Sequence, residues 1–325
     1  MSSIYWLARS GIAVAGNTPR QVRHVLASTV TSASYLGWRS KRRVTKQNMA
    51  RVMGLPTSDL RVRKAALGSW SKYGVTASHL ICLPYVNIGD IDARTTDLSQ
   101  GATWREYAEQ AMSAGKGMII TTGHFGSWDL AGAIAARYFP LSAIVDALAK
   151  DPRLNDLLQG HRRDKSVGVI PVSGAARRVM QALDDRRAVA IVVDRPVGPQ
   201  QGVEVTFFGH RTYVPAGSAT FAIRSGAAVM PGYFWHAPGR RYYIRTFPPI
   251  FPRVVTTAAE KAAEIGRLTQ YMMDCQEEVV RQFPTQWFMF RQFWPETDGL
   301  CCDGSCDVAD QRTSSMRTAL RRLLD

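Results

Sequence analysis

Short apolar segments alternate with helical patterns through the middle of the chain, and this alternation restricts the fold more than any other feature. Runs typical of buried strands lie at 117–122, 141–147, 167–172 and 188–193, with helix-like segments between them. Strands that alternate with helices form a parallel sheet with helices on both faces. The sequence therefore predicts an α/β fold with a central, largely parallel sheet.

Two further strands are expected at 227–235 and 242–247. Pro238 and Gly239 lie between them and favour a hairpin turn. Because a hairpin pairs its strands antiparallel, the sheet is expected to be mixed. A closing helix is predicted at 257–282.

Helical patterns also fill the N-terminal part, at 20–37, 46–53 and 59–84. From these patterns we divide the chain into three parts. They are a helical, membrane-interfacial region at 1–90, an α/β core at 91–296 that forms one domain with these helices, and a polar, flexible tail at 297–325, basic between Arg312 and Leu324.

Positive charge is concentrated near the N-terminus, where residues 1–64 hold twelve lysines and arginines against a single acid, Asp59. Segment 20–37 ends in aromatic residues and is followed at once by basic ones, as in a helix on an anionic membrane. Packing of this helix on the core is an equal alternative. The basic residues are Arg39, Lys41, Arg42 and Arg43.

Several classes of partner are not expected. No apolar run reaches the ~18–20 residues of a membrane span, so we expect a peripheral protein. The basic excess lies outside the α/β core and lacks the pattern of a nucleic-acid module, so no nucleic acid is expected. Five cysteines are an odd number for a disulfide framework and fit the reducing cytoplasmic face of the cell membrane. The tail cysteines lack a fourth zinc ligand, so no metal site is expected.

The stretch GHFGSWDL, 123–130, places a histidine and an aspartate on a strand-to-helix turn. Ser127 is a natural N-cap, which leaves His124 in the turn and Asp129 in the first helical turn. From there Asp129 is expected to accept a hydrogen bond from His124, whose other nitrogen would then deprotonate a hydroxyl. The alternative is that His124 satisfies the turn and Asp129 only caps the helix.

A second cluster of polar residues follows the strand at 188–193. Asp194 and Arg195 open a stretch with little regular pattern, and long irregular stretches in compact domains are often functional. Arg195 would bind a phosphate or pyrophosphate of a substrate, or else pair with a neighbouring acid. Asp194 is grouped with it as a substrate-binding residue. A short edge strand is expected at 203–208.

These motifs resemble the lysophospholipid acyltransferase superfamily, whose signature is His-x4-Asp, and within it the late lipid A and phosphatidylinositol mannoside acyltransferases. An aspartate at position 129, where the lipid A branch has glutamate, brings the resemblance closest to the mannoside branch. The similarity extends to four further stretches: RVTKQNMARVMG (43–54), GVEVTFFG (202–209), VPAGSATFAIRSGAAVMP (214–231) and PTQWFMFRQFW (284–294).

The resemblance implies an O-acyltransferase that needs no cofactor and uses acyl-coenzyme A or acyl carrier protein as co-substrate. It implies that Glu204 lies beside the catalytic His124 and that Arg162 contacts substrate. The acceptor that it implies is a hydroxyl of a glycolipid, and the closeness to the mannoside branch favours a phosphatidylinositol mannoside. A lipid A-type or other lysolipid acyltransferase and a non-catalytic lipid-binding protein of the same fold are the alternatives, whereas a serine hydrolase is disfavoured because no Gly-x-Ser-x-Gly motif is present.

Overall fold

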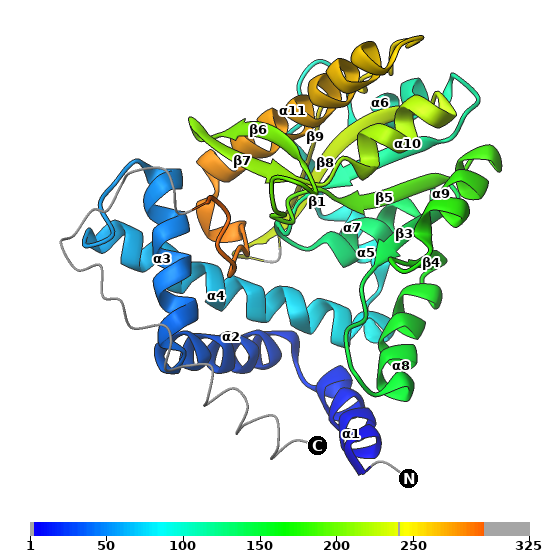
Figure 1. The fold of residues 1–325 in the computed structure, drawn as a ribbon. Helices are drawn as coiled ribbons and strands as arrows, with labels where there is room; N and C mark the ends of the chain where they lie inside the picture. The colour runs from blue at the N-terminus through cyan, green and yellow to red at the C-terminus, as the bar shows by residue number, and fades with distance from the viewer. Residues whose placement is uncertain (1–2, 240, 296–325) are drawn as a thin grey trace. The chain divides into compact units, whose positions relative to one another are not determined.

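A computed structural model describes residues 3–239 and 241–295 of the chain, and Met1–Pro295 form one compact unit (Figure 1). The predicted tail and its cysteines lie outside the described residues. Within them a seven-stranded sheet has the order β1–β9–β8–β2–β5–β3–β4. Its strands are β1 (Thr95–Asp97), β2 (Met118–Thr122), β3 (Leu141–Val145), β4 (Val167–Pro171), β5 (Ala188–Val192), β8 (Ala228–Ala237) and β9 (Arg241–Thr246).

The sheet is largely parallel, and β8 and β9 are its one antiparallel pair among the described strands. The predictions of an α/β fold and of a C-terminal hairpin are therefore confirmed. Strand β1, at the edge of the sheet, was not predicted; it is only three residues long, too short for a periodic pattern.

The prediction implied that the strand at 203–208 lies at the edge of this sheet. Strand β6 (Val203–Phe207) is formed there, but it does not belong to the main sheet. It pairs antiparallel with β7 (His210–Val214) in a separate two-stranded sheet that packs on α11 (Ala258–Gln282). The two-residue turn between the strands has φ of 52° at Phe208 and 76° at Gly209. Such positive φ values suit a tight hairpin turn, which pairs β6 with β7.

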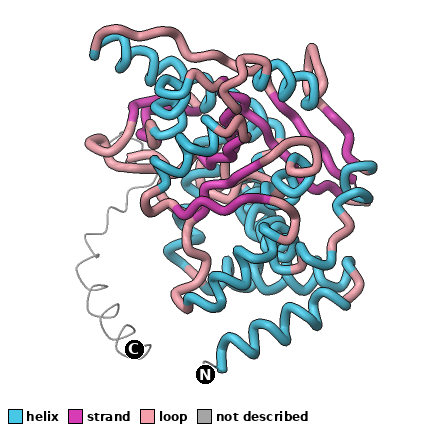
Figure 2. The backbone as a smooth tube through the Cα atoms, turned by 90° about the vertical axis from the view of Figure 1, so that its right-hand side faces the viewer, coloured by secondary structure: helices cyan, strands magenta, loops and turns pink. Residues whose placement is uncertain are grey.

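Helices cover both faces of the main sheet (Figure 2). Helices α9, α10 and α11 contact one face, and α6 and α7 contact the other. Successive side chains of β2 point to opposite faces of the sheet, so Ile119 packs in one buried cluster and Met118 in another. The helices of the sheet region are α5 (Ile88–Ala93), α6 (Trp104–Met112), α7 (Trp128–Ala135), α8 (Pro152–Arg163), α9 (Ala175–Asp184) and α10 (Gly217–Ser225).

The first four helices, α1 to α4, form the N-terminal part of the described chain, and α2 and α4 pack closely together (Figure 1). A Cβ at Gly74 of α4 would lie 2.3 Å from the Ala27 carbonyl of α2, so this crossing requires glycine. These helices are α1 (Ser3–Asn17), α2 (Arg20–Gly37), α3 (Arg39–Met53) and α4 (Leu60–Ile81); the short 3-10 turns are η1 (Leu83–Tyr85) and η2 (Pro284–Gln286).

Two details of these helices bear on the predictions. The helix expected at 46–53 begins earlier, at Arg39, so the basic residues that follow Trp38 lie in the first turns of α3. Among the described residues, no helix is both long and apolar enough to cross a bilayer.

Candidate active site

Two neighbouring strands bring together residues that are far apart in the sequence. β2 and β5 are parallel partners, and Thr122 is the register partner of Val192. His124 and Asp194 each follow their strand by two residues, so both lie at the carboxyl edge of the sheet. The Val193 N–H donates to the Thr122 carbonyl at 2.9 Å and continues the pairing beyond the strands.

The His124 side chain is bonded to Asp194. Its Nδ1 lies 2.7 Å from Asp194 Oδ1, and the backbone N–H of His124 donates to both carboxylate oxygens at 2.9 Å. The His124 side chain is 41% exposed, whereas that of Asp194 is fully buried. An ionised carboxylate can only accept, so Nδ1 carries the hydrogen and Nε2 is left as the basic nitrogen. This is the arrangement of a general base with its orienting acid.

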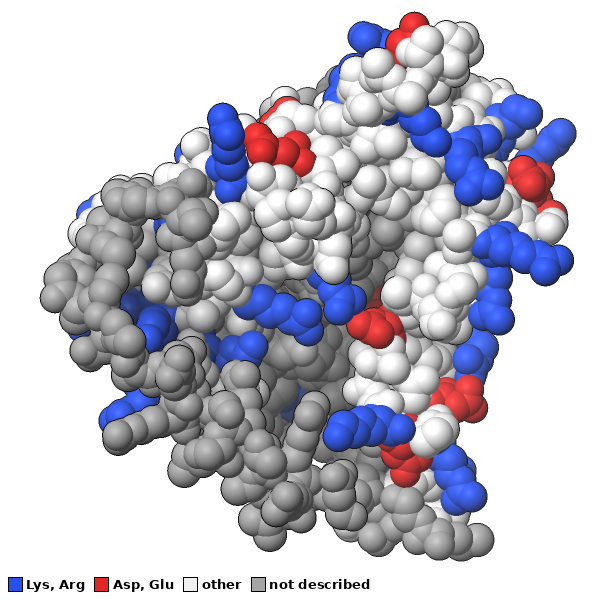
Figure 3. All heavy atoms as spheres, in the orientation of Figure 1, with Lys and Arg blue, Asp and Glu red and all other residues white. Residues whose placement is uncertain are grey.

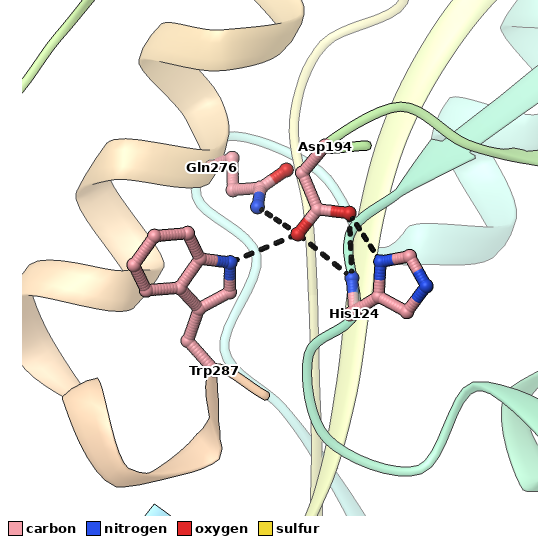
Figure 4. A network of polar contacts seen from close by, with 4 residues as sticks. All are labelled: His124, Asp194, Gln276 and Trp287. Atoms are coloured by element: carbon pink, nitrogen blue, oxygen red, sulfur yellow. Dashed lines mark hydrogen bonds and ion pairs between the residues drawn. The ribbon is translucent and has the colours of Figure 1, made fainter. Parts of the chain in front are cut away.

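Two donors from the C-terminal part of the chain hold the Asp194 carboxylate from its other side (Figure 4). Gln276 Nε2 on α11 donates to Oδ2 at 2.7 Å, and Trp287 Nε1 donates to the same oxygen at 2.9 Å. Oδ1 therefore remains directed at the imidazole. Glycine at position 123 makes room for this network, because a Cβ there would lie 2.4 Å from Gln276 Nε2.

The pKa values of the pair move in opposite directions. Burial by itself lowers the pKa of His124, but the charge and hydrogen bond of Asp194 outweigh it, and the pKa lies above its usual 6.5. Burial by itself raises the pKa of Asp194, but the charge of His124 and the hydrogen bonds from His124, Trp287 and Gln276 outweigh it, so the pKa lies below its usual value. Asp194 is therefore ionised at neutral pH.

Asp129 lies in the first turn of α7, as predicted, but its carboxylate faces α8. Its Oδ1 accepts from Arg162 Nε at 2.7 Å, and both side chains are buried. The predicted hydrogen bond between Asp129 and His124 is therefore wrong, because the guanidinium of Arg162 engages Asp129 while Asp194 engages His124. Arg162 Nη1 also donates to Gln159 Oε1 at 2.5 Å. This ion pair joins the start of α7 to the end of α8.

Glu204 lies on the exposed side of β6 and is not beside His124. Tyr213 Oη donates to Glu204 Oε2 at 2.9 Å, and Arg211 Nε lies 3.6 Å from Oε1. Among the described residues the structure gives no contact between Glu204 and His124. The implied position is wrong because side chains alternate along a strand: Val205 is buried, so its neighbour Glu204 points outward.

Arg195 lies near the imidazole and is half exposed. Its Nη1 is 3.2 Å from Asp146 Oδ2, and this is the ion pair considered as its alternative role. The charge of Arg195 also acts on His124 and lowers the pKa of the imidazole. Of the six predicted site residues, His124, Asp194 and Arg195 thus lie together, while Asp129 and Arg162 form a separate pair.

The turn after His124 is fixed by its own backbone hydrogen bonds. Gly126 has φ of 60°, and a Cβ there would lie 2.1 Å from the Phe234 carbonyl. Its N–H donates to the Gln286 carbonyl at 2.9 Å, and the Ser127 N–H donates to the Phe234 carbonyl at 2.7 Å. Ser127 occupies the N-cap position as predicted, but its hydroxyl bonds to His79 Nδ1 at 3.0 Å and does not cap the helix.

Gln276 and Trp287 were missed as site residues. Trp287 lies in the segment 284–294, which the resemblance singled out without giving any of its residues a role. A buried glutamine in the middle of a long amphipathic helix, as in α11, carries no sequence signal for the strand end that it contacts.

The fold is α/β, and the carboxyl edge of its sheet holds a histidine–carboxylate pair of the kind that enzymes use for general-base chemistry. The comparisons with known proteins add the reaction class. Residues 1–296 match the family model described as bacterial lipid A biosynthesis acyltransferase, and the chain belongs to this family. It is an acyltransferase.

Curated relatives cover most of the chain. A phosphatidylinositol mannoside acyltransferase of Mycolicibacterium smegmatis is 25% identical over 281 residues, which is 84% of this chain and 83% of the relative. One from Mycobacterium tuberculosis is 28% identical over 295 residues, 89% of this chain and 85% of the relative. The crystal structure of a 1-acyl-sn-glycerophosphate acyltransferase from Thermotoga maritima shares 12% identity, with a TM-score of 0.35 over 79% of this chain and 98% of that one.

Proposed function

We propose that this acyltransferase moves a long acyl chain from acyl-coenzyme A, or from acyl carrier protein, to a hydroxyl group of a glycolipid at the cytoplasmic face of the cell membrane. One observation carries the chemical part of the proposal. His124 combines a partly exposed imidazole with a buried, ionised Asp194 that holds its Nδ1. This pair is suited to take a proton from a hydroxyl.

The proposed reaction begins when Nε2 of His124 removes the hydroxyl proton of the acceptor. The acceptor oxygen attacks the thioester carbonyl carbon and forms a carbon–oxygen bond. When the tetrahedral intermediate collapses, the carbon–sulfur bond breaks and the imidazolium gives its proton to the leaving thiolate. Asp194 stabilises the imidazolium between these two proton transfers.

The oxyanion of the intermediate also needs hydrogen-bond donors. The turn amides of Gly126 and Ser127 both already donate to carbonyls. The amide of Trp128 is the first of α7 and has no partner within the helix. We therefore assign the oxyanion contact to Trp128.

A phosphatidylinositol mannoside is the proposed acceptor. The curated relatives carry that substrate in their names. Asp129, where the lipid A branch has glutamate, agrees with the same branch of the family. A sugar hydroxyl must then reach His124 while the lipid tails stay in the membrane.

The N-terminal helices support attachment to a membrane surface. Large apolar side chains of α1 and α2 are exposed, among them Leu7, Val25 and Val30 at 72%, 64% and 65%. A groove of about 590 Å³ between α2 and α4 has a largely apolar lining. Exposed apolar faces of this kind, followed by the basic residues of α3, suit the surface of an anionic membrane.

Three acceptors offered separately test the proposal. Labelled palmitoyl-coenzyme A is supplied with a phosphatidylinositol mannoside, with a lipid A precursor, and with a lysophospholipid. Label in the mannoside product supports the proposed acceptor. Label only in the lysophospholipid product would remove the glycolipid part of the proposal, and no label in any product would contradict the proposed reaction.

A further inference from the structure

Three charged groups act on the His124 imidazole: Asp194, Arg195 and Arg291. Asp194 and Arg195 follow β5, whereas Arg291 comes from the segment after η2 and received no role from the sequence. On the face of the molecule shown in Figure 3, basic side chains gather beside a hollow near the middle of the view. Two guanidinium groups therefore accompany a histidine whose base function requires it to become positively charged.

The backbone around Arg291 is fixed to the active site and to α3. The Phe288 N–H donates to the His124 carbonyl at 2.7 Å, which joins this segment to the catalytic turn. The Asn48 amide donates to the carbonyls of Met289 at 2.9 Å and of Arg291 at 2.8 Å. The backbone at Arg291 is therefore held in place, in a segment that is bonded to His124.

Within the part of the chain that the structure describes, the guanidinium of Arg291 has no acidic partner. Its side chain is exposed, and among the ion pairs of the described residues none includes it. Arg195 does have a partner, but the side chains of Arg195 and Asp146 are 47% and 67% exposed. Exposed pairs of this kind contribute little and are readily replaced by another anion.

The positive charges of Arg291 and Arg195 oppose the formation of an imidazolium at His124, so in the free enzyme they act against its use as a base. An anion bound to both would remove this opposition. Guanidinium groups bind phosphate oxygens through paired hydrogen bonds, and phosphate esters are therefore the matching ligand.

We propose that Arg291 and Arg195 together bind a phosphate ester group of a substrate beside His124. The inference rests on the proposed function and adds Arg291 as a residue that determines substrate specificity. Two sources of this chemistry are available in the reaction: the phosphates of a coenzyme A donor and the phosphodiester of a phosphatidylinositol-type acceptor. Binding of either would neutralise the guanidinium groups and make His124 a stronger base at the moment when the reaction needs one.

A kinetic comparison separates the two sources. Arg291→Gln is assayed with acyl-coenzyme A against the phosphate-free donor acyl-pantetheine, and with the lipid acceptor against a phosphate-free glycolipid carrying the same sugar. In one of the two comparisons we expect the substitution to lower kcat/KM about 10- to 100-fold with the phosphate-bearing substrate and to leave it nearly unchanged with the phosphate-free one. Arg291→Lys should recover part of the loss. Arg224→Gln is the matched control, because Arg224 is exposed on α10 and is not among the charges that act on His124.

A binding measurement makes the inference independent of turnover. The pKa of His124 is followed by NMR in the wild type and in Arg291→Gln, with coenzyme A or glycerophosphoinositol added. One of these soluble phosphate esters should raise the pKa of His124 in the wild type and leave it nearly unchanged in Arg291→Gln. If neither raises it in the wild type, or if kcat/KM falls equally with and without substrate phosphate in both comparisons, the inference is overturned. Absence of acyl transfer by the wild type would instead contradict the proposed function.

Discussion

Nδ1 of His124 lies 2.7 Å from Oδ1 of Asp194, although the two residues are 70 positions apart in the sequence. Adjacent parallel strands explain the contact, since both residues follow their strands by two positions from the paired residues Thr122 and Val192. Asp194 therefore comes from a different βα unit than the motif that contains His124.

Asp194→Asn should lower turnover on the order of 10²–10⁴-fold, because an amide cannot stabilise the imidazolium and does not fix Nδ1 as the protonated nitrogen. The measurement is steady-state turnover with palmitoyl-coenzyme A. Asp184→Asn, an exposed position at the end of α9, is the control and should keep wild-type turnover. Similar turnover in the two variants would remove Asp194 from the reaction.

The dependence of turnover on pH should follow the protonation of His124. A base must be neutral, so turnover should rise as pH increases through the pKa of His124, which Asp194 holds above 6.5. Removing the carboxylate charge in Asp194→Asn lowers this pKa, so the residual activity should rise at lower pH than in the wild type. A rising limb at the same pH in both proteins would show that another group titrates.

Asp129 and Arg162 should affect stability more than chemistry. Their charges form a buried ion pair at 2.7 Å, and loss of one partner leaves the other charge buried and unpaired. Asp129→Asn and Arg162→Leu should each lower the free energy of unfolding by about 3–5 kcal/mol. The double variant that combines Asp129→Asn with Arg162→Leu should lose less than the sum of the two single losses, as measured by denaturant titration. Losses that simply add in the double variant would contradict the pairing.

Asp129→Asn, assayed at a temperature where it is folded, should also keep the wild-type position of the rising limb in the pH profile. A shift of that limb would mean that Asp129 acts on His124 after all.

The sequence was sufficient to predict most strands and helices of the central sheet, though not β1. Apolar runs such as 117–122 and 188–193 predicted the parallel strands, and the helix at 257–282 is confirmed as α11, where Thr257 and Glu260 cap each other's backbone. These are local signals of periodicity and capping. The placement of His124 in the turn between β2 and α7 followed from the same reasoning.

The partners of His124 could not be predicted in this way, because periodicity assigns residues to strands but gives no strand order. The sequence indicated that His124 and Asp194 both follow strand ends, yet Asp129 was the nearer acid along the chain. Only the adjacency of β2 and β5 selects Asp194. The contact from Gln276 depends further on how α11 crosses the sheet, which is a property of tertiary packing.

Membrane attachment should depend on exposed basic residues at the start of α3. Arg39 and Arg43 are exposed, whereas Lys41 and Arg42 already donate to the carbonyls of Phe290 and Leu36. Changing Arg39 and Arg43 to glutamine should weaken binding to anionic vesicles by about 1 kcal/mol per residue, and salt should have the same effect.

Vesicle co-sedimentation measures this binding. Arg177→Gln with Arg178→Gln removes the same charge from the exposed side of α9 and serves as the control. If the two double variants lose equal amounts of vesicle binding, the effect comes from net charge and not from the position of the arginines. Equal binding to neutral and anionic vesicles would contradict the electrostatic contribution.

The central claim is that His124 is the general base of acyl transfer, and the most direct test is turnover of purified His124→Ala with a long-chain acyl-coenzyme A and a phosphatidylinositol mannoside. Because the His124 side chain is partly exposed in a turn, the alanine variant should fold, which its thermal unfolding temperature checks. We predict a loss of turnover on the order of 10²–10⁴-fold with an unfolding temperature close to that of the wild type. Wild-type turnover by the folded His124→Ala protein would contradict the claim.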